Sequence, residues 1–255
     1  MLRSFLSGLA LALAFTVTVS AQTADEIITK HLQAIGGVEK IKAIKTMRST
    51  GKLPVGPGIE APITMEQSRP NSFRLDIQVQ GMTITQAYDG ATGWKVMPFG
   101  GKKDPEVMSD DELKDAKEMA EFDSDLVDYK EKGNKVELLG KESVEGSEAW
   151  KLKVTRKDGK VNLYFLDAES FLLIKAESKR MNAQGAEVES ESVFGDYKEI
   201  DGVLYAHSIE QGPKGSQQKM KITLDKIEAN PKIEATRFKM PAAPRPEPKA
   251  EEKKP

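Results

Sequence analysis

Between residues 62 and 98 the chain alternates apolar and polar positions with a period of two. Phe73, Leu75 and Ile77 are each followed by a polar residue, and the apolar positions resume at Met82 and Ile84. Successive side chains of a strand point to opposite faces, so this pattern predicts strands with one apolar face and one polar face. Glycines at positions 81 and 90 suit hairpin turns, which favours consecutive antiparallel strands.

The same alternation returns in the second half of the chain. It predicts strands near residues 136–142, 149–156, 161–166, 171–180, 188–198, 203–211 and 218–229. The turns between them are short, so strands that follow one another in sequence should also be neighbours in the sheet. A mainly β (α+β) domain is therefore expected over residues 22–240. Its single antiparallel sheet would have about ten or eleven strands, a size that tends to curl.

The segment at residues 24–44 has helical spacing instead. Thr23 and Glu26 have the spacing of a capping box, and Ile27 and Leu32 belong to an apolar stripe that follows it. The stripe predicts that this helix lies on the apolar face of the sheet. His31 has polar neighbours in the sequence, which predicts a surface position for it.

A second helical insertion is predicted at residues 109–132, in the middle of the strand pattern. Ser109 and Glu112 again have the spacing of a capping box, and Leu113 and Phe122 lie on the apolar side of the helix. A cation site at the acidic residues 110–112 is the alternative interpretation. The lack of nearby histidine or cysteine argues against it, and we expect no metal.

Composition excludes several classes of function. The net charge of -2 argues against a nucleic-acid binder, which would normally be basic. No cysteine is present, so the fold must be stable without disulfides. The sequence contains no nucleophile elbow, phosphate-binding loop or zinc-binding helix motif, and His207 is the only histidine among the predicted strands. We expect neither an enzyme nor a cofactor.

Both ends of the chain differ from the domain. Residues 1–21 combine an early arginine, an apolar run and a small-residue cleavage site, which predicts a signal peptide and export to the periplasm. A membrane anchor is the alternative, but the run is shorter than the roughly 20 residues that span a bilayer. Residues 241–255 are rich in Pro, Lys and Glu, which predicts a disordered tail. This tail is either only solvated or a contact to an envelope surface.

Three short motifs recur in a fixed order. Residues 69–73 read RPNSF, residues 88–94 read YDGATGW and residues 235–241 read ATRFKMP. In order and spacing they resemble the periplasmic carriers and receptors that sort outer-membrane lipoproteins (the LolA/LolB-like family). The resemblance covers about residues 24–241.

The resemblance implies an incomplete barrel, covered by the N-terminal helix and by the mid-chain helices as a lid. Its hydrophobic cavity would take up acyl chains, as expected of a chaperone-like carrier in lipoprotein transport to the outer membrane. The same resemblance makes Arg69 the latch that hydrogen-bonds the lid. The apolar residues expected to line the cavity are Met65, Phe73, Leu75, Ile77, Met82, Ile84, Trp94, Val96, Leu113, Met119 and Phe122.

The sequence fits several kinds of cargo and partner. Lipoprotein, free phospholipid and another hydrophobic metabolite are all compatible with an apolar cavity. A carrier would exchange its cargo with an inner-membrane donor protein and an outer-membrane acceptor protein, and we expect it to be a monomer. The alternative from another class is an envelope sensor or scaffold of the same fold, which binds a protein partner and carries no lipid.

Overall fold

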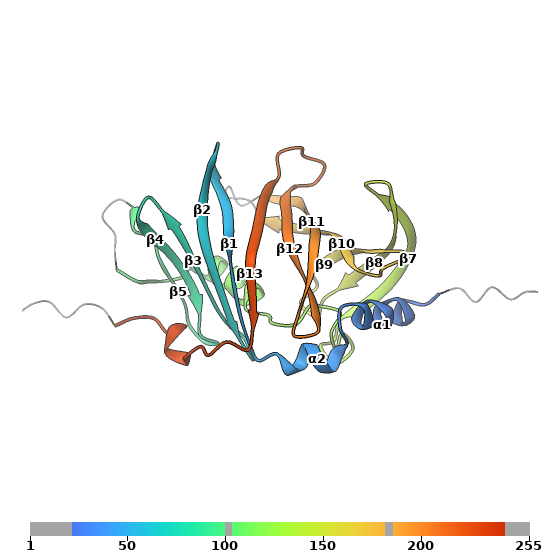
Figure 1. Ribbon diagram of the computed structural model, residues 1–255, viewed down its shortest axis with the longest axis horizontal. Coiled ribbons are helices and arrows are strands. Elements are labelled where there is room, and N and C mark those ends of the chain that lie inside the picture. The colour runs from blue at the N-terminus through green and yellow to red at the C-terminus, as the bar shows by residue number, and fades with distance from the viewer. Residues whose placement is uncertain (1–21, 100–103, 182–185, 243–255) are drawn as a thin grey trace, which may run out of the picture.

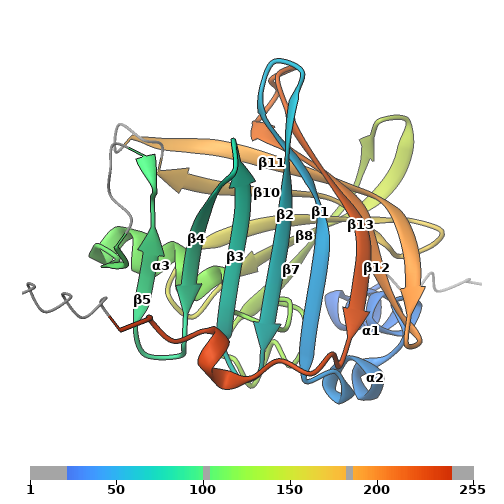
Figure 2. The same ribbon diagram turned by 60° about the vertical axis from the view of Figure 1, so that its left-hand side comes forward.

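The computed structural model describes residues 22–99, 104–181 and 186–242. The predicted signal peptide, and the predicted tail beyond residue 242, lie outside these ranges. Within them, thirteen strands form one curved antiparallel sheet that does not close (Figures 1 and 2). This confirms the predicted fold class, with more strands than the ten or eleven expected.

The strands come in two runs along the chain. The first run is β1 (Thr46–Gly56), β2 (Ile59–Ser68), β3 (Ser72–Val79), β4 (Met82–Tyr88), β5 (Gly93–Val96) and β6 (Glu106–Val107). The second is β7 (Lys135–Val144), β8 (Ser147–Thr155), β9 (Val161–Asp167), β10 (Leu173–Met181), β11 (Glu187–Ile200), β12 (Val203–Pro213) and β13 (Met220–Ala229). Within each run, sequence neighbours pair in space, as the short turns predicted.

The two runs are joined at the centre of the sheet, where β1, the first strand of the chain, pairs with β13, the last. A Cβ atom at Gly51 would lie 2.0 Å from the carbonyl oxygen of Thr223, so only glycine lets the two strands approach there. The sheet is therefore not one continuous meander. Its two edges are β6 and β7, which follow one another in the sequence.

The chain must therefore travel from one edge of the sheet to the other between β6 and β7. We call residues 108–134, which make this passage, the crossing segment. It begins with helix α3 (Asp110–Met119), whose capping box between Ser109 and Glu112 is confirmed. The helix ends at Met119, well before residue 132, and turns follow it. Because the segment connects opposite edges, it lies across one face of the sheet.

The two faces of the sheet have different coverings. Figure 2 shows α3 behind strands β3–β5 and the C-terminal part of the chain in front of them. We call the face toward α3 the inner face and the opposite one the outer face. The outer covering is residues 230–241, which include the short 3-10 helix η2 (Ala235–Arg237), and we call it the strap.

Helices α1 (Ala24–Ala34) and α2 (Val38–Ala43) pack with the second run of strands. The predicted capping box of Thr23 and Glu26 is confirmed, and Ile27 and Leu32 are buried in the largest core cluster. The prediction for His31 is wrong, because its side chain is buried with theirs. None of the helices in the described ranges combines the length and the apolar character that crossing a membrane requires.

Candidate functional site

Strands β1–β4, β12 and β13 present an apolar inner face that is only half covered. Ile63 pairs with Ile77, which pairs with Ile84, so these three side chains lie in one row. Met65 and Leu75 pair in the next row. We call the half-buried apolar side chains of this face the inner wall: Met47, Leu53, Met65, Leu75, Ile77, Val79, Met82, Ile84, Ile209 and Ile222.

The other half of the inner face is filled by contrast. There Leu152, Val154 and Leu166 have no exposed surface, because Ile27 and Ile28 of α1 pack with them. Leu126 and Val127 of the crossing segment belong to the same cluster. The completely buried part of the inner face thus lies on this side of the half-barrel, with partly buried side chains such as Leu138 and Trp150 packed against it.

Helix α3 covers one end of the inner wall. Leu113, Ala116 and Ala120 pack with Phe73 of β3 and Tyr88 of β4. A Cβ atom at Gly93 would lie 2.8 Å from a methyl carbon of Leu113, so this glycine permits the close approach of α3 to β5. The Nζ atom of Lys95 also forms an ion pair with Glu112 of the helix.

Most of the residues predicted to line the cavity lie on the inner face, and four of them meet under α3: Met65, Phe73, Leu75 and Leu113. Leu113 packs in the cluster under α3, and the strand residues share the face by their register: Met65, Phe73, Leu75, Ile77, Met82 and Ile84. Tyr88, Met108 and Ala116 belong to the same cluster and were not predicted. The alternation of β4 places Tyr88 on this face, whereas Met108 could not be assigned before the path of the crossing segment was known.

Trp94 and Val96 lie on the opposite face, and their prediction as cavity residues is wrong. Trp94 pairs with Ala87, and Val96 pairs with Thr85, whereas the inner-face residue Tyr88 pairs with Gly93. The indole nitrogen of Trp94 donates to the carbonyl oxygen of Phe238 at 2.7 Å. Trp94 is buried because the strap covers it, and not because it faces α3.

The two remaining predicted residues lie at the C-terminal end of α3 and just after it. The side chain of Met119 is exposed, and its backbone carbonyl accepts a hydrogen bond of 2.8 Å from the amide of Gln67. Phe122 is half-buried and packs against the cluster around Leu126, away from the inner wall. Neither residue joins the set under α3.

Arg69, at the turn between β2 and β3, contacts the crossing segment and the end of α2. Its guanidinium makes a two-pronged ion pair with the carboxylate of Asp123, with both distances 2.5 Å. It also donates to the carbonyl oxygens of Ile44 at 2.8 Å and Ile41 at 3.2 Å. The ring centroid of Phe122 lies 4.4 Å from the guanidinium carbon. The guanidinium of Arg69 therefore joins the turn between β2 and β3 to the crossing segment and to the end of α2. A guanidinium can do this because it has five N–H donors in one plane.

Asp125 fixes the far end of the crossing segment. Its side chain is 5% exposed and accepts hydrogen bonds from Arg156 at 2.8 Å, Asn162 at 2.9 Å and Tyr164 at 2.7 Å. Burial and the charge of Asp125 raise the pKa of Tyr164, so its phenol keeps the proton that it donates. The partners of Asp125, just after β8 and on β9, were not predictable from the sequence.

Comparison with known proteins bears on the fold. No protein-family model and no curated protein matches the sequence. A LolA superfamily protein from Nitrosomonas europaea superposes with a TM-score of 0.54 at 15% identity, over 86% of this chain and 98% of that chain. The chain has a LolA-like fold.

Two further structures superpose over nearly their whole length. A putative outer membrane lipoprotein-sorting protein domain from Vibrio parahaemolyticus has a TM-score of 0.54 at 15% identity, with 84% of this chain and 94% of that chain covered. A DUF1329 family protein from Desulfovibrio piger has a TM-score of 0.59 at 11% identity, with 86% and 98% covered. These superpositions establish the LolA-like fold. The sequence identities are too low to carry a function over, so function has to be argued from the site itself.

His31 makes the packing of α1 in this LolA-like fold sensitive to pH. Its Nδ1 atom donates to the carbonyl oxygen of Phe171 at 2.8 Å, and burial lowers its pKa below the ordinary 6.5. The unfolded chain therefore binds a proton that the folded chain excludes, so His31 should destabilise the fold as the pH falls below 6.5.

We expect the free energy of unfolding, measured by urea titration, to fall as the pH is lowered from about 6.5 to about 5, above the range in which most carboxylates titrate. The variant His31→Gln cannot take up this proton, and its stability should change less over the same range. An equal slope in the variant and the wild type would rule out His31 as the source.

Proposed function

We propose that this chain is a periplasmic carrier that binds the acyl chains of lipoproteins or lipids on the inner wall, for transfer toward the outer membrane. The observation that carries the proposal is the contrast between the two halves of the inner face. In one half, α1 and the crossing segment bury Leu152, Val154 and Leu166 completely, whereas the side chains of the inner wall stay partly exposed. A concave apolar surface beside a helix that lies over one end suits a long flexible hydrocarbon.

The chemistry of the wall fits such a cargo. Each methylene group that leaves water contributes about 0.8 kcal/mol, so an acyl chain gains affinity over its length without any specific polar contact. Methionines at positions 47, 65 and 82 supply flexible apolar surface that adapts to irregular guests. The predicted signal peptide supports a periplasmic location, and donor and acceptor proteins at the two membranes follow from a carrier role.

The first test is native mass spectrometry of the protein purified from the bacterial envelope, combined with displacement of a fluorescent fatty acyl probe. We expect a co-purified lipid or lipoprotein, and a probe that binds and is displaced by unlabelled fatty acid. If neither occurs and cross-linking captures one stable protein partner without lipid, the chain is the sensor or scaffold of the alternative hypothesis.

A charge in the middle of the inner wall should weaken binding of the acyl probe. Ile77→Asp places a carboxylate between Ile63 and Ile84, and burying it under an acyl chain is unfavourable. We expect about a fivefold to tenfold rise in the dissociation constant of the probe, the equivalent of about 1–1.4 kcal/mol.

Gln78→Asp is the matched control for this experiment, because it adds the same charge to the next residue of β3, where the side chain is exposed on the opposite face. The control should bind the probe as the wild type does. Equal weakening by both substitutions would show that the probe does not bind on the inner wall.

A further inference from the structure

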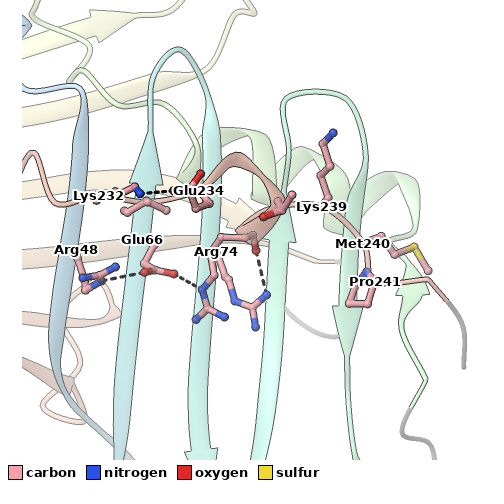
Figure 3. A pocket seen from close by; sticks show the side chains of 11 residues that line it. Arg48, Glu66, Arg74, Lys232, Glu234, Lys239, Met240 and Pro241 are labelled. Carbon is pink, nitrogen blue, oxygen red and sulfur yellow. Dashed lines mark hydrogen bonds and ion pairs between the residues drawn. The ribbon is translucent and has the colours of Figure 1, made fainter.

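A pocket of about 610 Å³ lies on the outer face, between the strands and the strap (Figure 3). Arg48 of β1 pairs with Glu66 of β2, which pairs with Arg74 of β3, so their side chains form one row across three strands. Figure 3 shows this row below the strap, with Lys239 and Met240 beyond it. Crossing segment and inner wall lie on the other face, so this pocket is separate from the proposed acyl site.

Cations outnumber anions at the strand side of the pocket. Glu66 accepts from Arg48 at 2.9 Å and from Arg237 of the strap at 2.6 Å. Asp76 accepts from Arg74 at 2.9 Å and from Arg237 at 2.7 Å. Three arginines thus share these two carboxylates, whose side chains are only 4% and 12% exposed. Glu228 lies 3.9 Å from Arg48 but pairs with Lys226 at 2.8 Å, so a local excess of one positive charge remains.

The arginines keep donors for another anion. A guanidinium has five N–H donors. Arg237 uses two nitrogens for Glu66 and Asp76, whereas Arg48 uses its Nε atom for Glu66 and has its Nη1 atom 3.9 Å from Glu228. Because the carboxylates are buried beneath them, the outer sides of Arg48 and Arg237, 32% and 41% exposed, are the sides that an incoming anion would meet.

The strap side of the pocket adds a further cation and an apolar rim. Lys232 is neutralised by Glu234 at 3.0 Å, whereas Lys239 is exposed and brings the local excess to +2. Met240 and Pro241 close this side. The pocket thus combines several forked donors, a positive charge that matches a phosphate group, and an apolar border.

We propose that the outer pocket binds a phosphate group. Guanidinium groups match phosphate oxygens in pairs, and a concave site with the opposite charge holds such an anion better than an open surface does. The phosphate comes either from the head group of an anionic phospholipid or from a free phosphate compound. This site lies beyond the proposed acyl carrier function and does not depend on it.

The test is calorimetric titration of the full chain with inorganic phosphate, at low and high ionic strength. Arg48→Gln/Lys239→Gln removes two cations, while Glu66 keeps its bond to Arg237 and so is not left unpaired. We expect phosphate to bind the wild type at low ionic strength, and the double variant to bind about tenfold more weakly or worse.

The matched control is Lys153→Gln/Lys179→Gln, which removes the same charge from side chains of β8 and β10 that are 37% and 59% exposed. It should bind phosphate as the wild type does. Absence of phosphate binding to the wild type, or equal affinity in the wild type and the Arg48/Lys239 variant, would overturn the proposal.

Co-sedimentation with vesicles then distinguishes the two sources of phosphate. Binding to phosphatidylglycerol vesicles but not to phosphatidylcholine vesicles, with loss of binding in the Arg48/Lys239 variant, assigns the pocket to a lipid head group. Phosphate binding without vesicle binding assigns it to a free phosphate compound. Displacement of the acyl probe should be the same in the wild type and this variant, so failure of either proposal can be recognised separately.

Discussion

Replacement of Arg156 by methionine should lower the free energy of unfolding by about 3–5 kcal/mol, the usual effect of leaving a buried charge without its partner. Arg156 lies 2.8 Å from the carboxylate of Asp125, whose side chain is 5% exposed. Methionine keeps much of the volume, but the carboxylate would then have only Asn162 and Tyr164 as donors. Urea unfolding followed by circular dichroism measures the loss.

The same substitution should loosen the crossing segment more than the sheet. Arg156 also pairs with Glu121, so it holds this segment at two carboxylates. Amide hydrogen exchange of residues 120–134 should accelerate more than that of β1 and β13. Lys153→Met is the control, because its exposed pair with Glu137 should contribute less than about 1 kcal/mol. A loss no larger than the control's would show that Asp125 does not depend on Arg156.

The strands between residues 62 and 98 illustrate what alternation can predict. Phe73, Leu75 and Ile77 share a face because the side-chain period of a strand is two, whatever the rest of the fold does. The capping boxes at Thr23 and Ser109 were predictable for a similar reason, because their bonds span only three residues. Local rules thus place the helix starts and divide each strand into two faces.

Which face becomes the inner one is not a local property. Trp94 and Val96 are apolar and alternate with Lys95, so the sequence suggests that they face the interior. Trp94 does face a covering, but it is the strap from the other end of the chain, as its bond to Phe238 shows. A sheet that is covered on both faces carries apolar residues on both faces. The alternation of apolar and polar residues alone therefore cannot show which apolar residues lie on the inner face.

His31 and Asp125 show a second limit of the sequence. Polar side chains are usually exposed, and each of these has polar neighbours along the chain. Both are buried because a partner more than thirty residues away satisfies them: the carbonyl oxygen of Phe171 for His31, and Arg156 for Asp125. Pairing of this kind depends on the β7–β10 half of the sheet, which no short-range pattern specifies.

Replacement of Arg69 by leucine should strengthen binding of the acyl probe about tenfold to a hundredfold. The crossing segment is held to the end of α2 and to the turn between β2 and β3 by the ion pair of Arg69 with Asp123 and by the bonds of Arg69 to Ile41 and Ile44. The acyl chain of a probe that inserts beneath the crossing segment must break these contacts. Forked charge-assisted hydrogen bonds are each worth about 1.5–3 kcal/mol. Without them more of the protein is in the open form, which raises the apparent affinity.

Asp123, the partner of Arg69 in this ion pair, provides the control for this prediction. Asp123→Leu removes the same ion pair and should also increase the affinity for the probe, and the double variant should gain little beyond either single one, because the two changes remove one shared contact. Stopped-flow binding of the probe should be faster in all three variants, because more of the free protein is in the open form. If Arg69→Leu binds the probe like the wild type while remaining folded, Arg69 supports the turn between β2 and β3 and does not oppose opening. If its effect adds fully to that of Asp123→Leu, the bonds of Arg69 to α2 matter more than its bond to the crossing segment.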